Sequence, residues 1–540
     1  MRSPDWRISI GRSRPERLAS GRGPGPWGLA ALGLLGLCLS IPLAMGSPKL
    51  FLAGILGLVV GLVVLLRPLV GFYLSVAAVP LDAAGRLGEI FPGVDLSLAK
   101  VLVLLTVAAW AVQLAMRRTT FVWARTASWL GAYVVAGALS LIDSRELDLG
   151  FPALVRLFST LVFYVLILNM VRTREVLLRT LGVFVTVSLL TFAFGIAEQY
   201  LPGFSFGTRT TWAERSAQTF GVEEHELDAG RFGTVSRSSG VFFHAIIYAV
   251  STDLLVPLLV GAAVVVPPGW RRAALWCGVG ICVAANISSY SRTGLLLLFV
   301  AVGLLAIRGH LRVTPVRIAF LVTAAVVTFL VLPESLRERV LSLGSYTLAG
   351  SESLRYRARL LESGWRAFSE HPVNGMGIET TYRIFDYFEY EDREAIITVH
   401  NGYLQVALEM GLPGIVLLLG FLGSTARSWL QARGEFRRRG DRPLRVLCEC
   451  LLISFVVFLL AGLTVDFMRI GFKNMWLLMG LAPVLRRLAT EEAPLPAAAS
   501  GSPRIATRGA PLAGGPGALR PSRPAQPGPG APGAGGATGG

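Results

Sequence analysis

The sequence predicts an all-α integral membrane protein whose chain crosses the bilayer about 12 to 14 times. Hydrophobic residues make up 53% of the 540 residues and charged residues only 16%, with a mean hydropathy of +0.59. Soluble domains carry about 25% charged residues. Apolar runs also recur along the chain, and most are long enough for a helix to cross a hydrocarbon core of about 30 Å.

In chain order, we expect fourteen spans, of which the third is short enough to be re-entrant. They cover about 27–46, 50–66, 68–81, 96–115, 127–142, 152–171, 176–197, 239–266, 273–289, 293–308, 316–332, 401–424, 443–464 and 471–486. The first apolar run follows a basic stretch and has two interpretations, an uncleaved first helix or a cleaved signal peptide. The many spans that follow favour the uncleaved helix.

The distribution of arginine predicts the orientation. A net charge of +17 is compatible with nucleic-acid binding, but the arginines cluster in short loops between apolar runs, as positive-inside topology requires. With the N-terminus in the cytoplasm, arginine-rich loops fall inside at nearly every step. These are 1–26, 117–125, 172–174, 271–272, 308–317 and 427–445.

The same alternation of inside and outside loops places the long loops and both ends of the chain. Two long loops, about 198–238 and 333–399, are rich in acidic residues and fall outside, the second just before the twelfth predicted span. We therefore expect a basic cytoplasmic N-terminus (1–26), a transmembrane domain (27–490) and a cytoplasmic tail (491–540). The tail is rich in Pro, Gly and Ala and is expected to be disordered.

The second outer loop contains a predicted amphipathic helix. Leu354, Ala358, Leu361, Trp365 and Phe368 recur at steps of four and three, which places them on one helical face. Such a helix can lie on the membrane surface with its tryptophan among the headgroups. Alternatively, it packs on its own loop. In both cases it brings a basic face close to the membrane.

Polar clusters mark the same outer side. Arg237 lies in RSSGVFFH and Arg292 in SYSRTG, the tight turn between the ninth and tenth spans. Arginine at membrane depth is costly and tends to mark a pathway or an anionic ligand, and small polar neighbours at a helix N-terminus suit a phosphate oxygen. The alternative is an interface arginine that extends its charge into water.

His400 and Asn401 open the twelfth span, and Glu409 lies nine residues after His400. Histidine is the side chain best suited to proton transfer near neutral pH, although a helix-end histidine with one hydrogen bond is also common. A carboxylate inside a span needs a partner. Asp253 and Asp466 are the other acids at or near span depth, and Asp253 is equally compatible with an ion path.

The five cysteines lie in or beside apolar runs and show neither metal-ligand spacing nor a disulfide framework. The sequence therefore gives no reason to expect a metal or another cofactor.

Together, these motifs resemble the O-antigen ligase and polymerase superfamily of bacterial envelope glycan enzymes. The family signature is His, then Asn, Ser or Gln, nine residues, and Gly-x-x-Gly; here it reads His400, Asn401, nine residues and Gly411-Leu412-Pro413-Gly414. HPVNGMGIETTY (371–382) resembles the family's Pro…Gly-x-Gly stretch, and SRTG and RSSGVF resemble its two arginine segments. The resemblance covers about 236–479.

The resemblance implies a GT-C-like fold in the inner membrane and a metal-independent, inverting transfer of a glycan from undecaprenyl pyrophosphate at the periplasmic face. It implies that Arg237, Arg292 and Arg357 hold the pyrophosphate and that His400, beside Asn401, activates or positions the acceptor hydroxyl. The family often has Trp four residues after its loop arginine, where this chain has Leu361. Arg355 and Arg359 therefore remain alternatives to Arg357, and Glu409 is a possible supporting residue.

Several functions fit this class. The resemblance favours a ligase acting in lipopolysaccharide or other envelope glycan synthesis. A polysaccharide polymerase with the same donor and a protein-glycosylating transferase are the alternatives within the class, with a glycan or lipid-glycan as acceptor and membrane lipids as surroundings. A transporter is the rival from another class, but the halves show no repeat and central acids are few.

Overall fold

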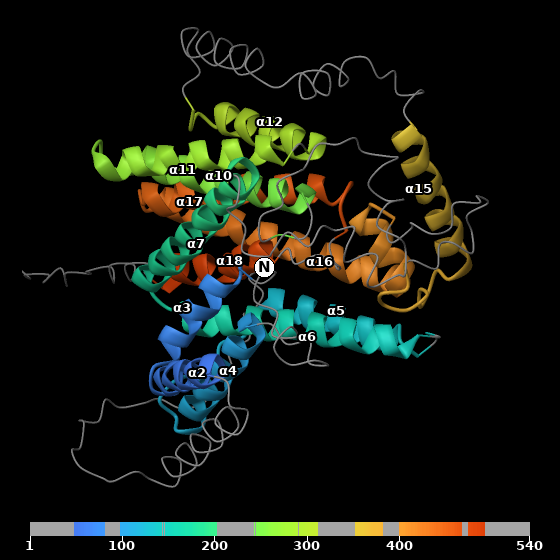
Figure 1. Ribbon diagram of the computed structural model, residues 1–540, viewed down its shortest axis with the longest axis horizontal. Helices are drawn as coiled ribbons and strands as arrows, with labels where there is room; N and C mark the ends of the chain where they lie inside the picture. The colour runs from blue at the N-terminus through green and yellow to red at the C-terminus, as the bar shows by residue number, and fades with distance from the viewer. Residues whose placement is uncertain are drawn as a thin grey trace, which may run out of the picture. The chain divides into compact units, whose positions relative to one another are not determined.

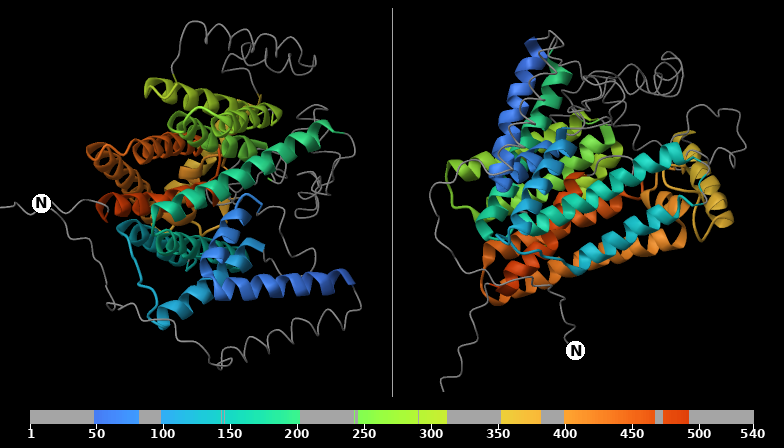
Figure 2. Two further views of the ribbon diagram at one scale, coloured as in Figure 1. Left: turned by 90° about the vertical axis from the view of Figure 1, so that its left-hand side faces the viewer. Right: turned by 90° about the horizontal axis from the view of Figure 1, so that it is seen from below.

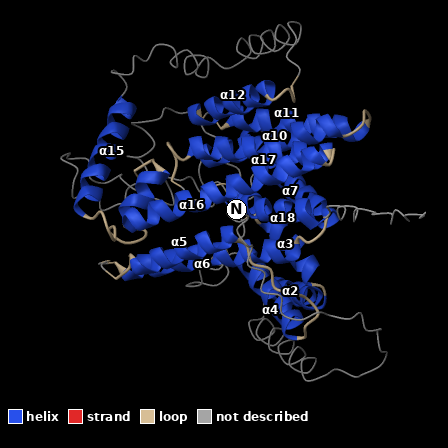
Figure 3. Ribbon diagram, turned by 180° about the vertical axis from the view of Figure 1, so that it is seen from behind, coloured by secondary structure: helices blue, strands red, loops and turns tan. Residues whose placement is uncertain are grey.

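The computed structural model describes residues 48–81, 98–142, 144, 146–201, 242, 245–289, 291–311, 352–381, 399–466 and 473–491. The chain divides into two units, 1–492 and 493–540, and all of these residues belong to the first. Throughout them, helix is the only regular secondary structure and no strand occurs (Figure 3). The helices are α2 (Pro48–Leu66), α3 (Pro68–Ala78), α4 (Leu98–Ala115), α5 (Arg125–Leu139), α6 (Leu147–Met170), α7 (Arg174–Tyr200), α10 (Ala245–Val265), α11 (Trp270–Ser288), α12 (Arg292–Ile307), α15 (Glu352–Glu370), α16 (Gly402–Arg438), α17 (Arg442–Ala461) and α18 (Lys473–Glu491).

Five of these helices, α6, α7, α10, α16 and α17, are long and apolar enough to cross a membrane. Shorter apolar helical segments occupy Gly57–Leu66, Pro68–Ala78, Ala99–Ala115 and Arg292–Ile307. These observations confirm the predicted class of all-α polytopic membrane protein.

Twelve of the fourteen predicted spans coincide with helices, and the other two, 27–46 and 316–332, lie outside the described residues. The largest difference is at the end of α16, which continues from the predicted end at 424 to Arg438. Thr425, Trp429, Ala432 and Phe436 are buried there at helical spacing. Packing against the neighbouring helices α17 and α18 therefore prolongs the helix beyond its apolar run.

The contacts sort the helix ends into two groups, which we call the His400 end and the arginine end. At the His400 end, Gly402 N donates to Gly462 O at 2.8 Å and so joins the start of α16 to the end of α17. At the arginine end, Arg487 donates to the carbonyl of Leu168 at 3.0 Å and so joins α18 to the end of α6. Figure 1 shows α16 running between α5 and α6 on one side and α17 on the other.

This grouping agrees with the predicted alternation of loops. Among the described loops, those expected outside (after α5, before α12, before α16 and after α17) lie at the His400 end, and those at 172–174, 308–311 and 439–441, expected inside, lie at the arginine end. In Figure 1 and in the right-hand view of Figure 2, α15 lies across the end of the bundle where α16 begins. The structure therefore brings the described parts of three segments singled out in the sequence, 291–294, 357–370 and 399–401, to one end of the helices.

Candidate functional site

The HPVNGMG segment (371–377) and the Gly411-Leu412-Pro413-Gly414 motif contact one another at a kink in α16. Gly411 has non-helical dihedral angles (φ 66°, ψ −164°), and Pro413 has no N–H to donate. The carbonyls of Leu408 and Glu409 therefore lose their helical donors. Instead they accept from Met376 N at 2.7 Å and Gly377 N at 3.1 Å. The HPVNGMG segment thus satisfies the backbone groups that the Gly411-Leu412-Pro413-Gly414 kink exposes.

Close approach of two backbones explains the glycines at this junction. Leu412 N donates to Pro372 O at 2.8 Å. A Cβ on Gly411 would lie 2.1 Å from Val373 O, and a Cβ on Gly375 would lie 2.5 Å from the carbonyl carbon of Glu409. Both glycines also have positive φ, which other residues adopt at a cost. The junction consequently tolerates only glycine at these two positions.

We expect Gly411→Ala to lower the stability of the protein by about 2 kcal/mol or more, because the left-handed conformation costs about 1–2 kcal/mol and the methyl group collides with backbone. Gly423→Ala in the same helix is the matched control, since nothing lies within 4 Å of its Cβ position. It should be neutral or stabilising by up to about 1 kcal/mol. Thermal unfolding in detergent measures both, and equal melting temperatures would contradict the role given to Gly411.

His400 and Asn401 form the turn that starts α16. Asn401 is the N-cap: its side-chain oxygen accepts from Tyr403 N and Leu404 N, both at 3.0 Å. His400 has φ +52°, an uncommon conformation for a non-glycine residue, and is half-buried. Val399, fully buried against Leu360 and Leu408, anchors the chain immediately before it. Buried and capped neighbours thus fix the position of the His400 backbone.

Arg292 occupies the first turn of α12, where the neighbouring serines shape the backbone. Ser289 Oγ donates to Asn286 O at 2.6 Å and accepts from Ser291 N at 3.1 Å, while Ser291 Oγ caps α12 by accepting from Gly294 N at 3.2 Å. The serines that we considered as phosphate ligands are therefore engaged within the turn. They place Arg292 at the positive end of the helix dipole, an unfavourable position for a cation.

Among the three loop arginines considered, Arg357 lies close enough to Arg292 for the two charges to influence each other. Burial and the charge of Arg292 lower the pKa of the Arg357 guanidinium. Arg359 is exposed, and the side chain of Arg355 lies outside the described residues, as does Arg237. Arg357 of α15 and Arg292 at the N-terminus of α12 therefore place two positive charges within electrostatic range of each other, an arrangement that favours an anion near both.

The packing of α15 relates this pair to His400. Leu360, Gly364 and Ala367 form its packed face, and a Cβ on Gly364 would lie 3.0 Å from both Val399 and Leu404 side chains. Arg357 is seven residues before Gly364, which corresponds to about 10 Å along the helix. Trp365, on another face of α15, is 62% exposed. Its exposure agrees with the alternative in which this helix lies on the membrane surface.

Glu409 lies at the α16 kink and is 1% exposed. Its Oε1 accepts from Gln405 Nε2 at 3.1 Å and from the hydroxyl of Thr381. Sequence reasoning missed both partners, although Gln405 lies one turn before Glu409 on the same helical face. It also missed Arg156 of α6, which forms an ion pair with Glu379 at 2.8 Å. Glu409 and Glu379 therefore hold the 371–381 segment in place, a supporting role.

Asp253 is fully buried in α10 and accepts from Asn286 Nδ2 of α11 at 2.8 Å. The same amide donates to Thr252 Oγ1 at 3.2 Å. A Cβ on Gly294, two residues after Arg292, would lie 3.2 Å from this Nδ2. The polar cluster therefore packs directly beneath the turn that carries Arg292 and ties α10, α11 and α12 together.

Comparison with known families places this region in a family. The O-antigen ligase family profile matches residues 273–419, which extend from α11 to the middle of α16 and contain Arg292, Arg357, His400 and the kink. The match confirms the resemblance drawn from the sequence motifs. No curated protein is matched by the chain.

Proposed function

Since residues 273–419 match the O-antigen ligase family profile, we propose that this protein transfers a glycan from undecaprenyl pyrophosphate to an acceptor hydroxyl. The observation that supports it most is the approach of Arg292 and Arg357 at an end of the helices where His400 also begins α16. A pyrophosphate leaving group carries negative charge that arginines can stabilise, and an acceptor hydroxyl needs a base.

In this proposal the acceptor oxygen attacks the anomeric carbon of the lipid-linked sugar, and the bond from that carbon to the pyrophosphate oxygen breaks. His400 takes the hydroxyl proton. Arg292 and Arg357, with Arg237 as a third candidate, stabilise the departing pyrophosphate. A single displacement of this kind inverts the configuration at the anomeric carbon. In this proposal donor and acceptor both reach the site from the leaflet at the His400 end, where the described part of α15 also lies.

The direct test uses purified protein, a glycan on undecaprenyl pyrophosphate and separate acceptors. We expect stoichiometric release of undecaprenyl pyrophosphate and a new glycosidic product. A lipid-glycan core as the preferred acceptor indicates a ligase, while lengthening of a second lipid-linked chain indicates a polymerase. Flux of the glycan across liposomes without any covalent product would instead support the transporter and would overturn the proposal.

The proposed orientation places the His400 end in the periplasm and the arginine end in the cytoplasm of a bacterial inner membrane. In a background without native cysteines, Ser369→Cys on exposed α15 should react with an impermeant thiol reagent added to intact cells from which the outer-membrane barrier has been removed. Gly434→Cys, exposed near the end of α16, should react only after lysis. The reverse pattern would contradict a periplasmic site.

A further inference from the structure

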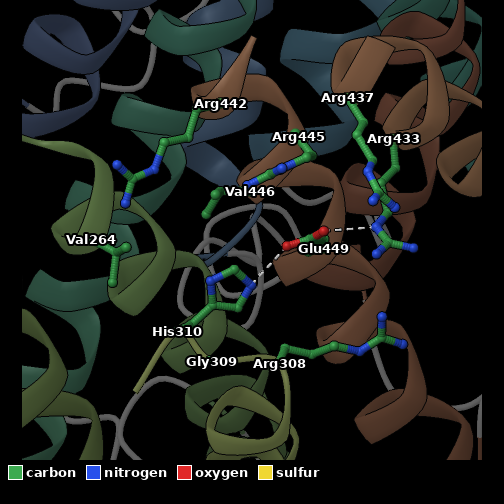
Figure 4. Close-up of a pocket in the computed structure, with 10 residues that line it drawn as sticks. All are labelled: Val264, Arg308, Gly309, His310, Arg433, Arg437, Arg442, Arg445, Val446 and Glu449. Carbon is green, nitrogen blue, oxygen red and sulfur yellow. Dashed lines mark hydrogen bonds and ion pairs between the residues drawn. The ribbon is translucent and has the colours of Figure 1, made fainter. Parts of the chain in front are cut away.

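A polar cavity lies at the opposite end of α16 from His400. It has a volume of about 270 Å³, several times the roughly 30 Å³ of one liquid water. Its lining comes from the ends of three helices and the turn after a fourth, and Figure 4 shows the side chains arranged around Glu449. The lining residues are Val264, Arg308, Gly309, His310, Arg433, Arg437, Arg442, Arg445, Val446 and Glu449. Because α16 separates Asn401 from Arg433 by 32 residues, the cavity is about 48 Å from the proposed active site along the helix.

The charges around this cavity do not balance. Five arginines face one carboxylate, and both oxygens of that carboxylate are engaged: Oε1 with Arg433 Nε at 2.8 Å and Oε2 with His310 Nε2 at 3.0 Å. Within the described part of the chain, Arg308, Arg437, Arg442 and Arg445 form no side-chain ion pair. The Nε of Arg445 is moreover buried without a hydrogen-bond partner. Buried unsatisfied donors and close like charges are unfavourable unless an anion supplies the missing acceptors.

Positive-inside bias accounts for exposed arginines such as Arg308, Arg437 and Arg442, but it does not direct the half-buried Arg433 and Arg445 to the same cavity. Burial lowers the pKa of His310, Glu449 opposes the shift, and the charges of Arg445 and Arg308 add to it. Arg445 belongs to α17 and Arg308 to the turn after α12, so arginines from two separate segments both act on the His310 imidazole.

We propose that this cavity binds the phosphate headgroup of an anionic phospholipid, with two-phosphate lipids bound best. Planar guanidinium groups match phosphate oxygens in pairs, and basic pockets between membrane helices bind such headgroups. The rim favours a lipid over a free phosphate compound. Ile307, next to Arg308, is 80% exposed, and Leu430, one turn before Arg433, is 51% exposed. Acyl chains can therefore continue along apolar helix surface beside the pocket.

The test compares Arg437→Gln/Arg445→Gln with the control Arg118→Gln/Arg427→Gln, which removes two exposed arginines outside the cavity. Each delipidated protein receives cardiolipin, phosphatidylglycerol, phosphatidylcholine or inorganic pyrophosphate. Lipid retention by native mass spectrometry and the melting temperature are measured. We expect cardiolipin to bind wild type and control alike and the pocket variant about 30-fold more weakly, since each basic residue near an anionic surface contributes roughly a factor of five.

Three results would overturn the proposal. Equal cardiolipin binding by the pocket variant and the control would show that general surface charge suffices. Equal stabilisation by phosphatidylcholine, whose headgroup has a phosphate but no net charge, would show that the cavity does not select anionic lipids. Full stabilisation by pyrophosphate alone would assign the cavity to a soluble phosphate compound. If the pocket variant fails to fold, Arg437→Lys/Arg445→Lys keeps the charges but loses the planar donors, and it should bind cardiolipin more weakly than wild type.

Discussion

Replacing His400 by asparagine is expected to reduce glycan transfer by about 10² to 10⁴, the usual contribution of a general acid–base group. Asparagine is the informative substitution, because it tolerates the left-handed backbone conformation that His400 adopts at φ +52°. Its amide cannot take the proton of the acceptor hydroxyl. The rate of transfer, measured with saturating donor and acceptor, should fall while the melting temperature in detergent stays close to wild type.

Two controls separate catalysis from structure at this turn. Asn401→Ala removes the cap of α16 and should lower stability by about 1 kcal/mol, whereas Asn401→Ser keeps a capping oxygen and should retain most activity and stability. His400→Asn should still bind the lipid-linked donor, since the arginines are proposed to hold the pyrophosphate. Wild-type transfer by His400→Asn would exclude a catalytic role, and a joint loss of folding and donor binding would show a structural one.

The second large effect concerns Arg292 and Arg357. We expect lysine at either position to weaken donor binding by roughly 10- to 100-fold, because lysine keeps the charge but loses the planar pair of donors, and a hydrogen bond to a charged group contributes about 1.5–3 kcal/mol. Arg359→Lys is the matched control, since Arg359 is an exposed residue on the same helix. Titration with fluorescent lipid-linked donor measures all three variants.

Arg357→Gln gives a second test, because loss of a purely structural arginine would lower thermal stability. Because burial and, to a smaller extent, the charge of Arg292 lower the pKa of Arg357, Arg357→Gln should leave thermal stability unchanged or raise it slightly while weakening donor binding. A large loss of stability in Arg357→Gln would contradict the arrangement. Strong donor loss in Arg359→Lys, with normal binding by Arg357→Lys, would move the site to the other face of α15.

Much of the fold could be predicted from the sequence because membrane helices obey local rules. Without water, each spanning segment must satisfy its own backbone hydrogen bonds, so long apolar runs specify helices without reference to their neighbours. The predicted run 443–464, for example, corresponds to α17 at Arg442–Ala461. The extension of α16 to Arg438 was missed because burial of Trp429 and Phe436 against other helices sets that end.

The sequence by itself therefore determined the helical membrane class, the placement of the spans, and the identity of His400, Asn401 and Arg292 as residues to test. Apolar length and arginine bias are properties of short segments, so they can be read locally. Only the tertiary structure decided that the Pro372–Gly377 segment fills the Gly411 kink, that the charges of Arg357 and Arg292 influence each other, and that five arginines line one cavity at the other end. These features depend on contacts between residues far apart in the chain, and helical periodicity carries no information on which distant side chains will meet.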